Sequence, residues 1–255
     1  MDPKILIITQ ARIGSGRLPS KVLRGIGKET LLSLHLKRIL KSRLATKIIV
    51  ATTLEKEVQG ILKICDRLKV DYFQGSTEDV LDRFYQAAKD YCPDWIVRLT
   101  SDCPLLDPEL VDDVISFAVK NNKDYATNTF VENFPDGQDV EVFKYTALKE
   151  AWENATLKSE REHVTPYIRK NSDYSGKVLF TALNYDCESD YSNIRMTVDE
   201  IVDLDLIKIL VEKLGINKSW ETYTNYIIDN DLGKINDNII RNEGLMKSLK
   251  EENNG

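Results

Sequence analysis

Short apolar runs alternate with amphipathic segments through the first half of the chain. Four runs rich in Val, Ile, Leu or aromatic residues predict buried strands: 4–9, 47–52, 70–73 and 95–99. The segments between them carry apolar residues at the spacing of helices: 30–39 with Thr30 as N-cap, 55–68, 78–91 and 108–120. Strands that alternate with helices in this way predict an α/β fold built on a doubly wound, mainly parallel sheet.

The second half of the chain has a less regular pattern. It predicts strands at 138–143, 177–182 and 195–198, and helices at 145–154, 160–169 and 201–214. We expect a main domain over 1–215, with an irregular α+β insertion at about 125–185, and C-terminal helices that form an appendage over 216–255. The last residues, 251–255, are expected to fray.

Composition narrows the class of protein. The chain has 255 residues, of which 42% are hydrophobic, and a formal net charge of −6, which disfavours a nucleic-acid polymer as partner. No apolar run approaches the ~20 residues of a membrane-spanning helix, and no secretory signal is evident, so we expect a cytoplasmic protein without membrane insertion. The four cysteines form no C-x-x-C pair, and there are only two histidines. We therefore expect reduced, mostly buried thiols and neither a zinc site nor a multi-histidine centre.

Charge is distributed unevenly near the N-terminus. No carboxylate occurs between Pro3 and Lys28, where an even distribution would place roughly four. The loop 10–21 in this stretch directly follows the first predicted strand, and such sheets bind ligands beyond the carboxyl ends of their strands. The loop matches neither a dinucleotide-binding nor a Walker signature. Its glycines and long cations nevertheless suit a polyphosphate, the alternative being a solvated basic loop.

Six motifs follow one another along the chain: Arg12-x-x-Ser15-x-Arg17-Leu18-Pro19-x-Lys21, Gly75-Ser76-x-x-Asp79-Val80-Leu81-x-Arg83, Arg98-Leu99-Thr100-Ser101-Asp102-Cys103-Pro104-Leu105, the run 134–143, Arg161-Glu162-His163-Val164-Thr165-Pro166-Tyr167 and Arg195-Met196-Thr197-Val198-Asp199-Glu200. Together they resemble the signature of the CMP-sugar synthetases, the cytidylyltransferases that act on acylneuraminate and Kdo-type sugar acids. The resemblance covers about residues 4–214 and is closest to the spore-coat-polysaccharide branch, the SpsF-like proteins. One departure is Ser101, where the family commonly has glycine.

The resemblance implies a nucleotide-diphospho-sugar transferase-like fold and an enzyme that joins CTP to a sugar-acid oxygen, releasing pyrophosphate. Such a transfer needs in-line positioning and neutralisation of charge more than covalent help from the protein. The catalytic residues that the resemblance implies are Arg12, Lys21 and Asp102, with Arg12 and Lys21 on the triphosphate. The nucleotide-binding residues that it implies are Ala11, Arg12, Gly14, Ser15, Gly16, Arg17, Lys21, Arg83 and Asp102.

Two aspartates are candidate ligands of magnesium. Asp102 follows the predicted strand 95–99, and the family's second metal carboxylate maps to Asp199. Mg²⁺ takes few carboxylates together with phosphate oxygens, so one aspartate from each half of the chain is sufficient. The alternatives are an Asx-turn at Asp102 and a helix cap at Asp199. We favour the metal role at both positions.

The resemblance also implies acceptor-binding residues: Gln138, Asp139, Glu141, Arg161 and His163. Asp139 and Glu141 are expected on one face of the predicted strand 138–143, where paired carboxylates can bind sugar hydroxyls. His163 stands in a charged run, so a substrate contact and an ordinary surface helix remain equally open. His35, between two leucines, is assigned no role.

Three functions are compared. The first is a Mg²⁺-dependent cytidylyltransferase that makes a CMP-sugar for surface polysaccharide biosynthesis, with CTP and a sugar acid as substrates. The second is a glycosyltransferase that consumes a nucleotide sugar; its D-x-D candidate, Asp203-Leu204-Asp205, lies in a predicted helix and is a poor metal site. The third is a catalytically silent nucleotide-binding partner, against which the retained cations and aspartates argue. The resemblance implies a homodimer, with 130–185 as the contact region.

Overall fold

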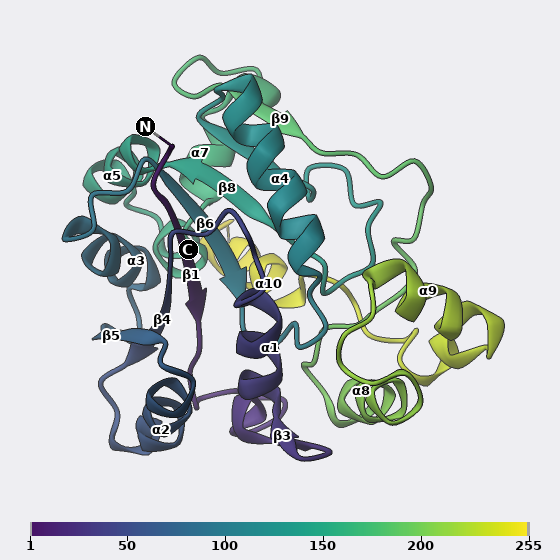
Figure 1. Ribbon diagram of the computed structural model, residues 1–255. Coiled ribbons are helices and arrows are strands. Elements are labelled where there is room, and N and C mark those ends of the chain that lie inside the picture. Colours follow the sequence, from purple (N-terminus) through teal and green to yellow (C-terminus); the bar gives the residue numbers. More distant parts are fainter. Residues whose placement is uncertain (1, 254–255) are drawn as a thin grey trace.

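The computed structural model describes residues 2–253 of the chain (Figure 1). The strands are β1 Ile5–Gln10, β2 Gly25–Ile26, β3 Glu29–Thr30, β4 Lys47–Thr53, β5 Asp71–Gly75, β6 Trp95–Thr100, β7 Tyr125–Thr127, β8 Glu141–Lys144 and β9 Ala182–Asn184. The α-helices are α1 Leu31–Ile39, α2 Gln59–Leu68, α3 Val80–Lys89, α4 Pro108–Asn121, α5 Tyr145–Asn154, α6 Lys158–His163, α7 Pro166–Lys170, α8 Ile201–Leu214, α9 Trp220–Asp229 and α10 Glu243–Asn253. Four short 3-10 helices complete the described elements: η1 Lys21–Leu23, η2 Lys56–Val58, η3 Asp173–Ser175 and η4 Leu232–Ile235.

The main sheet has seven strands in the order β5-β4-β1-β6-β8-β7-β9. β1 pairs in parallel with β4 and β6, and β4 pairs in parallel with β5. β8 is antiparallel to both β6 and β7, whereas β9 is parallel to β7. The predicted doubly wound, mainly parallel sheet is therefore confirmed. The chain order reverses at β1, so the crevice beyond β1 and β6 is the switch point where such sheets bind ligands.

Alternate residues of β1 enter two different cores. Ile5 and Ile7 belong to the core under α1, α2 and α4, whereas Leu6 and Ile8 belong to the core under α3, α5 and α7. These helices cover the two faces of the sheet (Figure 1). A parallel strand covered on both faces is apolar at successive positions, which explains why short continuous apolar runs predicted these strands correctly.

A third core joins α8 and α9 to α1 and to the hairpin β2–β3. Beside it, the buried guanidinium of Arg38 donates to the carbonyl oxygens of Leu106, Ile216 and Lys218 at 2.8, 2.7 and 3.0 Å. Burial lowers the pKa of this guanidinium from its ordinary value, and the carbonyl oxygens satisfy its donors. The start of the segment 216–255 is thus fastened to α1.

Two predicted elements of the second half differ from the structure around residue 165. The single helix predicted at 160–169 is wrong: α6 and α7 replace it. Val164 has a φ of 72° between them, and Pro166 begins α7. A proline has no N–H to continue a preceding helix. The predicted strand 138–143 begins only at Glu141, so Asp139 precedes β8 instead of lying on it.

Two predicted strands are largely or wholly absent from the described structure. The strand predicted at 177–182 is wrong except for its last residue, because β9 begins at Ala182. The strand predicted at 195–198 is also wrong. Its amides are used one by one across loops: Met196 donates to the carbonyl of Asp136 at 2.7 Å, and Val198 donates to that of Asp102 at 2.9 Å. These bonds hold the segment against the end of β6 without forming a strand.

The C-terminal segment returns to the main body after α9 and η4. α10 packs against α6 and includes residues 251–253, so the expected fraying is wrong there; residues 254–255 lie outside the described residues. No helix in the described range 2–253 has the length and apolar character needed to cross a membrane. All four cysteines are free: Cys65 and Cys103 are buried, Cys187 is half-buried and Cys92 is exposed.

Candidate active site

A cavity of about 730 Å³ opens beyond the carboxyl ends of β1 and β6. The loop after β1, the residues after β6, and the segments 195–199 and 242–247 contribute to its lining. Most of the predicted site residues line it: Ala11, Arg12, Ser15, Gly16, Arg17, Lys21, Arg83, Asp102, Asp139, Glu141, His163 and Asp199. The fold therefore gathers at one place residues that are scattered along the sequence.

The side chain of Lys21 lies between two carboxylates from opposite halves of the chain. Its Nζ donates to Oδ2 of Asp102 and to Oδ1 of Asp199, each at 2.8 Å. The other oxygen of Asp199 lies 3.1 Å from Nη2 of Arg17 and accepts from Arg195 at 2.8 Å. The two predicted metal ligands are thus neighbours on either side of one ammonium group.

The loop after β1 is anchored on both sides of Lys21. Leu18 is buried in the third core and Val22 in the core under α1. Between them Ser20 adopts a left-handed backbone with φ 55°, and one 3-10 turn begins at Lys21. The amides of Ser15 and Ser20 both donate to the carbonyl of Ile13, at 2.9 and 3.2 Å. The local fold therefore directs the lysine into the cavity.

Pairing fixes the protonation states of these groups. Burial lowers the pKa of Lys21, but the carboxylates of Asp102 and Asp199 outweigh burial and hold this pKa above its ordinary value. Burial raises the pKa of Asp102, but the charge and hydrogen bond of Lys21 hold it well below its ordinary value. Lysine and aspartate are therefore both charged at neutral pH, and removing Lys21 would leave two carboxylates facing each other without the cation that they share.

Arg195 connects this pair to the rest of the cavity. It donates to Asp136 at 2.5 Å, to Asp199 at 2.8 Å and to Asp203 at 2.9 Å. Asp203 also accepts from the amides of Asp199 and Glu200, each at 2.9 Å, at the start of α8. The helix-cap alternative for Asp199 is wrong, because Glu200 is the N-cap of α8 and both oxygens of Asp199 accept from cations of the cavity. The spacing of Arg195, Asp199 and Asp203 by four residues was the available sequence signal for this role of Arg195.

Glu141 lies at the first position of β8, on the far side of the cavity. It accepts from the hydroxyls of Tyr125 and Thr165 at 2.5 and 2.6 Å and pairs with Arg98. Burial raises the pKa of Glu141, but Arg98, Arg169 and these hydroxyls outweigh it and hold the pKa below its ordinary value. The carboxylate is therefore ionised and largely satisfied by the protein.

Asp139, in the loop before β8, and His163, at the end of α6, also line the cavity. Asp139 accepts from Nη2 of Arg241 at 2.6 Å. His163 ends α6, and its Nε2 lies 3.3 Å from the hydroxyl of Ser248 on α10. Burial, together with the charges of Arg98 and Arg12, lowers the pKa of His163, which favours the neutral imidazole. The histidine faces the cavity lining instead of an open helix surface.

Comparison with known proteins identifies the family. Residues 6–225 match the cytidylyltransferase family. The chain belongs to this family. It is 44% identical over 203 residues to an uncharacterized protein of Methanocaldococcus jannaschii, and this alignment covers 80% of this chain and 81% of that protein. It is 36% identical over 217 residues to the spore coat polysaccharide biosynthesis protein SpsF of Bacillus subtilis, and this alignment covers 83% of this chain and 88% of SpsF.

Two further comparisons bear on this cytidylyltransferase. A solved cytidylyltransferase from Leptospira borgpetersenii has a TM-score of 0.85 at 33% identity and covers 93% of this chain and 98% of that one. A shorter match, 34% identical over 109 residues, is to a 3-deoxy-manno-octulosonate cytidylyltransferase of Pelodictyon phaeoclathratiforme and covers 43% of each protein. The protein is a CTP-dependent nucleotidyltransferase, as the sequence predicted.

Three residues predicted in the site of the cytidylyltransferase do not line its cavity. The buried amide of Gln138 accepts from the backbone of Asp107 at 2.9 Å and donates to the carbonyl of Leu105 at 3.1 Å. Arg161 pairs at 2.5 Å with Asp79, the N-cap of α3. Gly14 is exposed at the surface of its loop. Gln138 and Arg161 are therefore committed to structural contacts, contrary to the expectation that they face the acceptor.

Burial lowers the pKa of two further basic side chains, Arg83 and His35. Arg83 lines the cavity and donates to the carbonyl of Ser76 at 2.8 Å, while burial and the nearby Arg12 lower its pKa to about 10. His35 is fully buried, and burial lowers its pKa to about 4. Its Nδ1–H donates to the carbonyl of Cys103 at 2.9 Å, and its Nε2 accepts from the hydroxyl of Thr9 at 3.0 Å. The structure gives His35 a core role and no place in the cavity lining.

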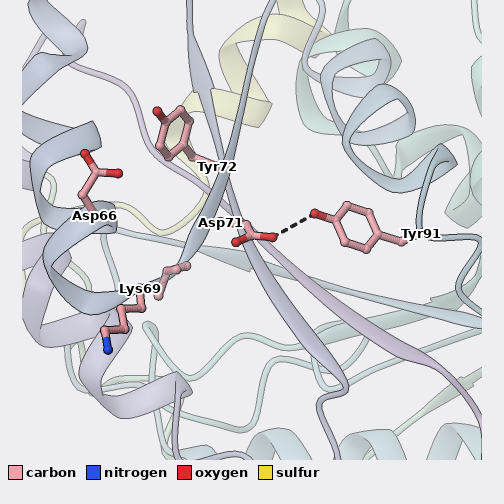
Figure 2. A pocket seen from close by; sticks show the side chains of 6 residues that line it. Asp66, Lys69, Asp71, Tyr72 and Tyr91 are labelled. Atoms are coloured by element: carbon pink, nitrogen blue, oxygen red, sulfur yellow. Dashed lines mark hydrogen bonds between the residues drawn. The ribbon is translucent and has the colours of Figure 1, made fainter.

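A second hollow, of about 470 Å³, lies around the start of β5. Figure 2 shows the hydroxyl of Tyr91 donating to Asp71, at 3.0 Å. Asp71 also pairs with the exposed Lys47 at 2.5 Å. This hollow is lined by Asp66, Lys69, Val70, Asp71, Tyr72 and Tyr91. None of them is a predicted site residue. The cavity at the switch point is therefore the candidate active site.

Proposed function

We propose that the enzyme joins CTP to a hydroxyl oxygen of a sugar acid, giving a CMP-sugar and pyrophosphate for surface polysaccharide biosynthesis. The acceptor class is a sialic-acid, Kdo or related 2-keto-3-deoxy acid. The observation that carries the proposal is Lys21, held between Asp102 and Asp199 where β1 and β6 end. The similarity to SpsF and to the 3-deoxy-manno-octulosonate cytidylyltransferase supports the pathway and the acceptor class.

In this proposal the loop after β1 binds the triphosphate. Arg12, Arg17 and Lys21 neutralise its charge, and the backbone of Ser15 and Gly16, which line the cavity, lies along it. The acceptor oxygen forms a bond to the α-phosphorus while the bond from that phosphorus to the α–β bridging oxygen breaks, so that this oxygen leaves with pyrophosphate. The proton of the acceptor hydroxyl passes to solvent water. The protein contributes cations already held in place for the charge that spreads over the leaving pyrophosphate.

Asp102 and Asp199 fit a magnesium ion. Both present hard carboxylate oxygens to the point that the Lys21 ammonium occupies, so the site is already arranged around a positive charge. No group of three or more His, Cys, Asp or Glu side chains between residues 2 and 253 forms a metal site. An ion held by two carboxylates takes its other ligands from phosphate and water, as Mg²⁺ does. When bound, it neutralises phosphate charge.

The acceptor occupies the part of the cavity between β8 and α6. Asp139 can accept hydrogen bonds from sugar hydroxyls, and His163 can contact the acceptor from α6. Arg98 and Arg169 offer positive charge to the carboxylate of a sugar acid, and Nε of Arg98 is buried without a hydrogen-bond partner in the described structure. Together these groups suit an acceptor that carries one carboxylate and several hydroxyls.

The glycosyltransferase alternative finds no metal site in its D-x-D sequence. Asp203 is fully buried and bound to Arg195. Asp205 is exposed on α8 and pairs with Lys208 at 3.0 Å. The two carboxylates therefore have different surroundings, and neither lines the cavity.

Incubation with magnesium, each nucleoside triphosphate in turn and a panel of sugar acids tests the proposal. We expect pyrophosphate and a CMP-sugar with CTP, and little product with ATP, GTP or UTP. The panel includes N-acetylneuraminate and 3-deoxy-manno-octulosonate. Absence of both products with every sugar acid would sink the proposed acceptor class.

We also propose that two copies associate through the segment 130–185. Its exposed apolar side chains support this surface: Val131, Tyr174, Val178 and Leu179. Val178 is 97% exposed, so Val178→Asp has little to disturb in the monomer. Light scattering is expected to give the mass of two chains for the wild type and of one chain for Val178→Asp; a monomeric wild type contradicts the proposal.

The division of the chain into a main domain over 1–215 and an appendage over 216–255 stays a prediction.

A further inference from the structure

The end of the chain contributes to the cavity although it lies outside the family match. The match ends at residue 225, yet Asn242, Glu243 and Lys247 line the cavity. Nη1 of Arg17, in the triphosphate loop, donates to Glu243 at 2.6 Å. The segment 236–253 is therefore part of the wall of the active site, and the family motifs do not describe it.

This segment is fastened on both sides of the cavity. At its start, Nδ2 of Asn236 donates to Asp203 at 2.8 Å, beside Arg195. At its end, the backbone amide and the hydroxyl of Ser159 on α6 donate to Glu252 at 2.5 and 2.8 Å. Figure 1 shows α10, in yellow, near the end of β6. The residues between these anchors cross the acceptor side of the site.

Arg241 lies within this segment and contacts several carboxylates of the cavity. Its Nη2 donates to Oδ1 of Asp139 at 2.6 Å, and its Nη1 donates to the carbonyl of Phe134 at 3.2 Å. Its Nε lies 3.7 Å from Glu132 and 3.9 Å from Asp136. The side chain is 12% exposed and does not line the cavity, whereas all three of these carboxylates do. Arg241 therefore lies behind an acidic wall and holds it together.

We propose that Arg241 is a positioning residue for the acceptor: it fixes Asp139 so that the second carboxylate oxygen accepts a hydrogen bond from an acceptor hydroxyl. This inference rests on the proposed function. Asp139 makes no other side-chain hydrogen bond within the described residues, which leaves its Oδ2 for a ligand. Three carboxylates facing one cavity repel each other, and a buried guanidinium with a fixed fork both offsets that repulsion and sets one carboxylate rotamer.

Steady-state kinetics of Arg241→Gln separate this role from simple anchoring of the chain. The probe is whichever of N-acetylneuraminate and 3-deoxy-manno-octulosonate turns over with the wild type. We expect the acceptor KM to rise roughly tenfold or more while the CTP KM changes by less than about twofold. Arg241→Lys keeps the charge and is expected to recover part of the loss. The matched control is Lys234→Gln, which removes an exposed cation of the same region that pairs with Asp231; both KM values are expected to stay unchanged.

Two results would overturn the inference: an acceptor KM within about twofold of wild type in Arg241→Gln, or equal increases of both KM values. A double variant sharpens the test, because Arg241 is argued to act through Asp139. Adding Asp139→Asn to Arg241→Gln is expected to raise the acceptor KM little further. Additive effects of the two substitutions contradict the inference, since they would mean independent roles.

A structural measurement keeps the inference testable if no sugar acid turns over. Crystals of wild type and of Arg241→Gln, each with CTP, show the position of the Asp139 side chain directly. We expect the carboxylate to leave its wild-type rotamer in the variant. An unchanged rotamer overturns the positioning role even when the acceptor is unknown, whereas failure of the whole sugar-acid panel with a displaced Asp139 counts against the acceptor class alone.

Discussion

Nζ of Lys21 donates to Oδ2 of Asp102 at 2.8 Å although 81 positions separate the two residues. They meet because β1 and β6 are neighbouring parallel strands, so the loop after one and the residues after the other leave the sheet at the same edge. Asp199 completes the arrangement from the other half of the chain. The contact joins the loop after β1, which we propose binds the triphosphate, to the first candidate metal ligand, and the next two predictions depend on it.

Asp102→Asn tests the metal site. The amide keeps the size of the side chain but removes a negative charge, so we expect Mg²⁺-dependent kcat to fall at least about 100-fold. Lys21 keeps Asp199 as partner, and the fold is expected to remain intact. Pyrophosphate release against magnesium concentration, with circular dichroism for the fold, measures this. Asp205→Asn on the exposed face of α8 is the control; near-normal turnover of Asp102→Asn would show that the metal assignment is wrong.

Lys21→Ala tests the triphosphate contact. The variant loses a cation and leaves Asp102 and Asp199 facing each other, so we expect the Kd for CTP to rise roughly 10- to 100-fold. Calorimetric titration with CTP and magnesium gives this value. Lys28→Ala removes an exposed lysine of the same basic stretch and serves as control. Equal, small effects of both substitutions would indicate only a diffuse basic surface.

Glu243→Gln tests competition for Arg17. The Glu243 carboxylate pairs with Arg17, which we propose also binds the triphosphate, and the pair is largely open to solvent. Such pairs are weak, so we expect the CTP KM to fall by about two- to fivefold. Initial rates at saturating acceptor measure the change, with Glu221→Gln on α9 as control. A raised CTP KM would mean that Glu243 helps to bind the nucleotide.

His35 is expected to make stability depend on pH. Its pKa is about 4 in the folded protein and about 6.5 when unfolded, so the unfolded chain binds more protons between these values. The stability that the neutral, buried His35 contributes to the free energy of unfolding is fully present above about pH 6.5. It is lost as the pH falls towards 4, and the loss reaches at most about 3 kcal/mol. Urea unfolding at pH 7, 6, 5 and 4 is compared with His35→Asn. Parallel curves for the two proteins rule out this contribution.

Gly137→Ala tests the packing between the loop 134–140 and the segment 195–198. Gly137 has a φ of 105°, and a Cβ there would lie 2.7 Å from the backbone of Met196 and Thr197. We expect a loss of about 2 kcal/mol or more in the free energy of unfolding. Gly25→Ala, where a Cβ meets nothing within 4 Å, is the control. Thermal unfolding with equal midpoints for the two variants contradicts this account.

The first half of the fold could be predicted because local pattern and tertiary burial agree there. A strand such as β1, covered by helices on both faces, must be apolar at successive positions, and this pattern is visible without coordinates. The capping role of Thr30 was also local: its side chain accepts from the amide of Ser33 at 3.2 Å. The second half mixes short elements with loops, so similar apolar patterns at 177–182 and 195–198 did not become the predicted strands.

The sequence by itself determined the sheet, the cation-rich loop and the family, because each is carried by neighbouring residues. Only the tertiary structure decided which polar groups face the cavity. Gln138 and Arg161 lie in matching motifs yet are satisfied by the protein, whereas Arg195 and Arg241 hold the carboxylates of the site. These ion pairs join residues up to 109 positions apart. The distant partners, Asp136 for Arg195 and Asp139 for Arg241, depend on where loops meet at the sheet edge, which no local pattern contains.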